Sequence, residues 1–169
     1  MASVISSGAD APMVSFENET ARIAIERNVV VAAWFQEPRA PLELREMERA
    51  GKKVSAKYKG ASALFNVIIS GKPSFSEEVR NEVNRITSDD TLFTAATAHV
   101  ILVEGFVGSA VRAFLATALV MSRTKTPNKT FNDVGLAAKW VKERLDAVKT
   151  EGWNEADLVT FVKYTTTRK

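Results

Sequence analysis

The segment EGFVGSAVRAFLATALVMSR, Glu104–Arg123, is the most apolar part of this 169-residue chain, and its assignment decides the fold. A membrane-spanning helix needs roughly 20 consecutive apolar residues. The apolar run here covers only residues 105–121, and Arg112 lies near its middle, where an ionisable side chain is costly in a bilayer. We therefore predict a helix of a soluble protein, with no membrane insertion.

This predicted helix has two distinct faces. One face is apolar at helical spacing and suits a core: Val107, Val111, Phe114, Leu115 and Ala118. The other face carries a small residue at every fourth position: Gly105, Ser109, Ala113 and Thr117. Small residues let another backbone approach closely, so we expect this face to pack on the protein's own sheet, with self-association into a homo-oligomer as the alternative.

The rest of the chain alternates between strand and helix patterns. Ala21–Glu26 alternates in polarity and Val29–Phe35 is a continuous β-favouring run, so the two predict a hairpin. Further buried strands are predicted at 62–70 and 97–104, and short ones at 13–17 and 130–131. Helices are predicted between and after them, with N-terminal caps at Ser74 (with Glu77), at Asn132 or Asp133, and at Asn154.

Strands that alternate with helices indicate βαβ units and a mostly parallel sheet. We predict an α/β fold with a single sheet of about four to five strands, a leading hairpin and a cover of helices. Residues 13–146 are expected to form this domain. Residues 1–12 are expected to be a flexible tail, and residues 147–169 a C-terminal helical extension.

Composition narrows the function. The chain has no Cys, which excludes disulfides, thiolate chemistry and Cys-ligated metals. Residues 1–21 contain no Lys or Arg, so they lack the basic start of a signal peptide, and a cytoplasmic location is expected. The basic residues have no aromatic residues interleaved for base stacking, so we predict no nucleic-acid partner; they are Lys52, Lys53, Arg123, Lys125 and Lys129.

The order of elements, with segments such as AHVILVEGFVGSAVRAFL, resembles the STAS-like domains, which include the SpoIIAA-type anti-anti-sigma factors. The resemblance covers residues 20–145. It implies a non-enzymatic, regulatory domain that binds a protein partner. In the anti-anti-sigma factors a Ser in an Asp-x-Ser-Gly-type turn is phosphorylated; the junction here reads IISGKPSFSEEV and lacks that Asp and Gly. Ser74 and Ser76 are therefore candidate phosphorylation sites, with helix capping as the alternative.

A second hypothesis is a carrier or sensor for a small apolar ligand, held in a crevice at the carboxyl edge of the sheet. Its candidate residues are Trp34, Phe35, Gly71 and Gly105.

Other candidates for chemistry have structural explanations. His99 is the only His, and on a buried strand it is expected to be a hydrogen-bonded core residue. Asp89 and Asp90 are adjacent and point in different directions, so a turn is expected rather than a shared proton or metal. No nucleophile–base pair or metal cluster can be assembled, so we predict no catalytic residues, no metal and no cofactor.

Overall fold

The computed structural model describes residues 12–36, 41–71, 76–122, 125–150 and 152–168. These residues form one α/β domain with six strands and five helices. In chain order the elements are β1 Met13–Glu17, β2 Ala21–Glu26, β3 Val29–Trp34, α1 Leu42–Tyr58, β4 Ala63–Ile68, α2 Glu77–Thr87, β5 Ala96–Ile101, α3 Gly105–Ser122, β6 Asn128–Phe131, α4 Val134–Ala147 and α5 Glu155–Thr166.

The sheet follows the order of the chain, from β1 at one edge to β6 at the other. Strands β1 to β3 are antiparallel, and β3 to β6 are parallel. This confirms the α/β class and the leading hairpin. The strand count is higher than predicted because both short candidates form: β1 pairs with β2, and β6 pairs with β5.

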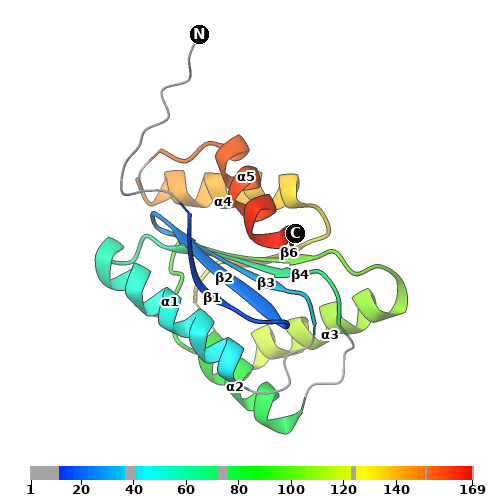
Figure 1. Ribbon diagram of the computed structural model, residues 1–169. Coiled ribbons are helices and arrows are strands. Elements are labelled where there is room, and N and C mark those ends of the chain that lie inside the picture. Colours follow the sequence, from blue (N-terminus) through cyan, green and yellow to red (C-terminus); the bar gives the residue numbers. More distant parts are fainter. Residues whose placement is uncertain (1–11, 37–40, 72–75, 123–124, 151, 169) are drawn as a thin grey trace.

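Helices cover both faces of the sheet (Figure 1). Each crossover from β3 to β6 advances one strand in the same direction, so right-handed connections put α1, α2 and α3 on the same face. Helices α4 and α5 cover the other face. Strand β3 is apolar throughout because both of its faces are covered. Val30 and Ala32 pack toward α1, whereas Val29 and Val31 pack toward α4 and α5.

The C-terminal helix belongs to this core. Residues 147–169 were predicted from the sequence to be a C-terminal helical extension. In the structure, α5 buries its apolar residues Leu158, Phe161 and Val162 in the same cluster as the sheet. Just before α5, the Trp153 Nε1–H donates to Asn28 Oδ1 over 2.8 Å in the interior. Asn28 also donates to the Ala61 carbonyl, so it ties the hairpin to two distant segments. In the turn of this hairpin, Arg27 has a positive φ of 50°.

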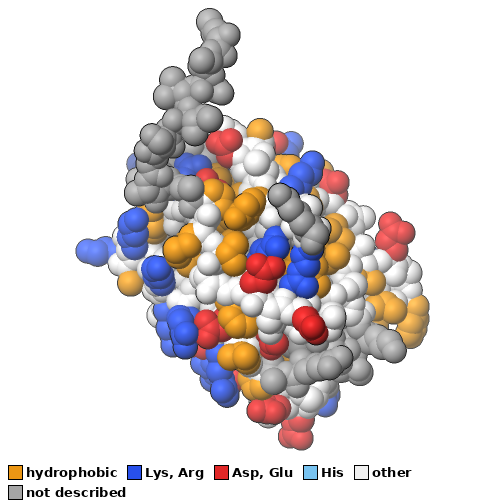
Figure 2. Space-filling view, in the orientation of Figure 1, with side chains coloured by type: hydrophobic (Ala, Val, Ile, Leu, Met, Phe, Trp, Pro, Cys, Tyr) orange, Lys and Arg blue, Asp and Glu red, His pale blue; other side chains and the backbone are white. Residues whose placement is uncertain are grey.

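Helix α3 is less enclosed than predicted. Val111 and Leu115 are buried against β5, as the apolar face requires, and Val107 and Phe114 are half-buried. The small-residue face is exposed along its length (Gly105, Ser109, Ala113 and Thr117), so it does not pack on the sheet. Phe106 is 85% exposed and Val120 78%. Figure 2 shows hydrophobic side chains at the surface where α3 lies.

Among the described residues, no helix has the length and apolarity to cross a membrane. The burial of Val111 and Leu115 fits that result, because one side of α3 is occupied by the protein's own core.

Candidate functional site

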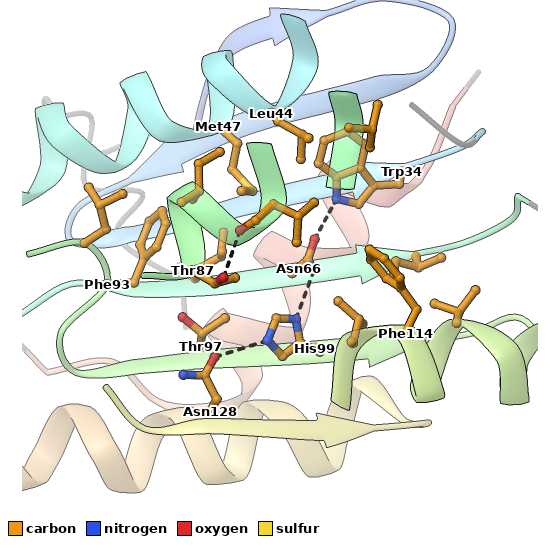
Figure 3. Close-up of a pocket in the computed structure, with 18 of the residues that line it drawn as sticks. Trp34, Leu44, Met47, Asn66, Thr87, Phe93, Thr97, His99, Phe114 and Asn128 are labelled. Carbon is orange, nitrogen blue, oxygen red and sulfur yellow. Dashed lines mark hydrogen bonds between the residues drawn. The ribbon is translucent and has the colours of Figure 1, made fainter. Parts of the chain in front are cut away.

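A cavity of about 110 Å³ lies between the sheet and helices α1 to α3 (Figure 3). Its floor consists of side chains from four adjacent strands: Trp34, Leu64, Asn66, Ile68, Thr97, His99 and Asn128. Its roof consists mainly of apolar side chains from the three helices and the turn after α2: Leu44, Met47, Val79, Val83, Ile86, Phe93, Val111, Phe114 and Leu115. The cavity is therefore apolar above and partly polar below.

The polar part of the floor is a row of hydrogen bonds that crosses four strands. The Trp34 Nε1–H donates to Asn66 Oδ1 over 2.6 Å. Asn66 Nδ2 and His99 Nδ1 are 3.0 Å apart, and His99 Nε2 and Asn128 Oδ1 are 3.1 Å apart. Asn128 Nδ2 then donates to the Thr126 carbonyl over 2.8 Å. Figure 3 shows Asn66, His99 and Asn128 in line along the sheet.

The direction of every bond in this row follows from its first member. An indole N–H only donates, so Asn66 must present its oxygen to Trp34 and its amide nitrogen to His99. His99 Nδ1 is then the acceptor, which puts the ring hydrogen on Nε2 and directs it to Asn128 Oδ1. We call these side chains, Trp34, Asn66, His99 and Asn128, the polar row.

The polar row holds a neutral imidazole. His99 is 3% exposed, and burial lowers its pKa to about 4, against an opposing effect of the hydrogen bond to Asn128. Both ring nitrogens are engaged, so the ring is a structural element of the floor. This confirms the predicted hydrogen-bonded core histidine.

Thr97 is the polar floor residue outside the row. It lies two residues before His99 on β5, on the same face of the strand, and it is 6% exposed. Its backbone N–H donates to the Pro127 carbonyl, but its hydroxyl has no hydrogen-bond partner within the described residues. Because Thr97 lines the cavity, its hydroxyl is a candidate for contact with a ligand.

No Lys or Arg lines the cavity in the part of the chain that the structure describes. Asp89 is at its edge, where its carboxylate accepts from the backbone N–H and the hydroxyl of Thr91. This is the turn that the sequence predicted for Asp89 and Asp90. The described lining of the cavity is thus neutral or weakly acidic.

A charged cluster on the outside holds two roof helices together. Glu48 of α1 accepts from Arg85 of α2 at 2.6 and 2.9 Å and pairs with Lys52 at 3.0 Å. The hydrogen bonds from Arg85, more than those from Lys52, lower the pKa of Glu48 to about 2.

Of the four residues that the sequence predicted to contact a ligand, two line the cavity and two do not. Trp34 and Gly71 line the cavity. Phe35 lies outside it, with the Arg168 guanidinium 3.7 Å from its ring centroid. Gly105 is exposed, and no atom would lie within 4 Å of a Cβ placed on it. The cavity thus extends from Gly71, just beyond the carboxyl end of β4, to the space under the helices.

The candidate phosphorylation sites are placed only in part. Ser74 lies outside the described residues. Ser76 is the N-cap of α2, and its Oγ accepts from the Val79 backbone N–H over 3.2 Å. The predicted cap at Ser74 is therefore shifted to Ser76, whereas the caps at Asp133 and Asn154 form.

The described residues give little evidence for a metal-binding or an anion-binding site. Among the described residues, no group of three or more His, Cys, Asp or Glu is placed to hold a metal ion. Lys and Arg gather along the outer face of α1, as Figure 2 shows, but Arg45, Arg49 and Lys52 are paired with Glu residues. Lys129 is on β6 at the far edge of the sheet, against Phe131, and Arg123 lies outside the described residues.

Asn66, Thr97 and Asn128 were not predicted as site residues from the sequence. A signal was present: Asn66 is a polar residue inside the apolar strand SALFNVIIS, and Thr97 and His99 alternate with Ala96, Ala98 and Val100. This spacing places the polar residues on one face of their strands.

Neither a family model, nor a curated protein, nor a solved structure matches this chain. The fold and the site define it as a single α/β domain with an internal apolar cavity above a polar row.

Proposed function

We propose that this protein is a non-enzymatic carrier or sensor that binds a small, largely apolar molecule in the cavity beneath α1 to α3. The observation that carries the proposal is the combination of an apolar roof and volume with a few convergent polar groups on the floor, which is the usual composition of a ligand site. A volume near 110 Å³ approaches that of an engineered apolar cavity of roughly 150 Å³ that takes benzene.

A role of His99 as a general acid or base is disfavoured by its state. Its two nitrogens are both bonded within the floor, and its lowered pKa leaves no proton to donate at neutral pH. A general acid or base needs a free nitrogen directed at the substrate.

A variant with a filled cavity tests the proposal. Val83 lines the roof, and Val83→Phe adds a ring to the cavity. Native mass spectrometry of protein purified from its own cell should detect a retained small molecule on the wild-type chain and none on Val83→Phe. Val148→Phe is the matched control, because Val148 is 44% exposed just after α4, the helix on the opposite face of the sheet. Equal retention by all three proteins, or binding of no small molecule from the cell or from a neutral apolar probe set, would contradict the proposal.

A second candidate is the regulatory interaction domain that the STAS-like resemblance implies, with a protein partner and a cytoplasmic location. The leading hairpin and the alternating βα units support the resemblance. The exposed apolar residues of α3 favour a contact between proteins, and a second copy of this chain is the partner we propose for it. Helix α3 also supplies roof residues Val111 and Leu115, so one helix would connect the ligand to the interface in a sensor.

A further inference from the structure

The chemical class of the ligand can be inferred from the hydrogen-bond donors on the cavity floor that lack a partner among the described residues. We infer that it is an uncharged molecule, about the size of a six-membered ring, whose one polar group is an oxygen that accepts a hydrogen bond from the floor. This inference rests on the proposed function and specifies its ligand.

Two donors on the floor remain available. The Thr97 hydroxyl lines the cavity and has no partner within the described residues, and Thr97 as a whole is 6% exposed. Asn66 Nδ2 carries two hydrogens and makes one bond, to His99, so its second hydrogen also lacks a protein partner in the described part of the chain. Because the Asn66 nitrogen only donates and a hydroxyl can donate, either group can be satisfied by an acceptor oxygen on the ligand.

The rest of the polar row cannot serve a ligand in this way. His99 uses both nitrogens, and the Trp34 N–H is directed to Asn66. The hydroxyl of Thr87, elsewhere on the wall, already donates to the Val83 carbonyl over 2.8 Å. The ligand's oxygen is therefore placed near Thr97 and Asn66, at the β4–β5 part of the floor.

The charge of the ligand is inferred from the residues that line the cavity. A carboxylate buried here would meet no Lys or Arg among the described lining residues, while Asp89 lies at the edge. Burying an unpaired charge is far more costly than burying a carbonyl. A hydrocarbon, at the other extreme, would enter but leave the Thr97 hydroxyl without a partner.

Three probes of similar shape test this: cyclohexanone, cyclohexane and cyclohexanecarboxylate. Binding is measured on the wild-type chain at pH 7 from shifts of the Trp34 indole N–H in two-dimensional NMR spectra. The ketone should bind about tenfold more tightly than the hydrocarbon, which is the net effect of one hydrogen bond. The carboxylate should not bind.

Thr97→Val removes the hydroxyl at nearly constant shape and should reduce the preference for the ketone, with only the second Asn66 hydrogen left to donate, while it keeps cyclohexane binding. Thr97→Ser should retain the preference. If the ketone and the hydrocarbon bind wild type equally, if the carboxylate binds best, or if Thr97→Val shows the full wild-type preference, the ligand class is wrong and the cavity remains a ligand site. If no probe binds wild type, the proposed function itself loses its support.

Discussion

His99 should make the free energy of unfolding decrease as the solution is acidified from pH 7 to pH 5. Its pKa is about 4 in the folded chain, against an ordinary value of 6.5, because burial disfavours the imidazolium. Between these values the unfolded chain binds a proton that the folded chain excludes. The stabilisation is therefore complete above pH 6.5 and is lost as the pH falls toward 4. The loss amounts to about 2 kcal/mol between pH 7 and pH 5 and to about 3 kcal/mol below pH 4.

The assay is urea unfolding at closely spaced pH values, followed by circular dichroism, on wild type and on His99→Gln. His99 is the only histidine of the chain. The shifted carboxylates, Glu48 among them, have pKa values lowered from 4.5, so they change stability only at lower pH. His99→Gln should be less stable than wild type at pH 7 but nearly independent of pH from 7 to 5. A flat wild-type profile, or the same slope in both proteins, would refute a buried neutral imidazole.

Three further predictions concern packing. Phe161→Ala should lower the free energy of unfolding, measured in urea, by about 3–5 kcal/mol, because α5 packs in the hydrophobic core. A change near zero would indicate that α5 is a dispensable extension. Gly51→Ala would place a Cβ 2.6 Å from the Phe93 ring and should cost about 1–3 kcal/mol, whereas Lys53→Ala on the exposed side of α1 should change stability by less than about 0.5 kcal/mol. If Gly51→Ala were more stable than wild type, the Phe93 ring would have to move aside without cost. Ala113→Glu, on the exposed small-residue face, should convert a dimer seen by light scattering into a monomer, and a monomeric wild type at high concentration would contradict self-association.

The sequence by itself determined the order and type of the elements. The unbroken apolar run of β3, the alternation of β2 and the caps at Asp133 and Asn154 each depend on residues close together in the chain. Local pattern and propensity are enough for such features. The shift of the α2 cap from Ser74 to Ser76 shows the usual limit, since neighbouring serines offer the same local chemistry.

Tertiary structure alone decided the site. Asn66, His99 and Asn128 are separated by 33 and 29 residues and become neighbours only when parallel strands align in one register. The pairing of Trp153 with Asn28 spans 125 residues, and it makes Asn28, between the two strands of the hairpin, a buried anchor. The small-residue face of α3 has the same pattern whether it packs on a sheet or faces solvent. Which of these occurs depends on how the other helices fill the space above the sheet, because burial is a property of the whole packed core rather than of any one segment.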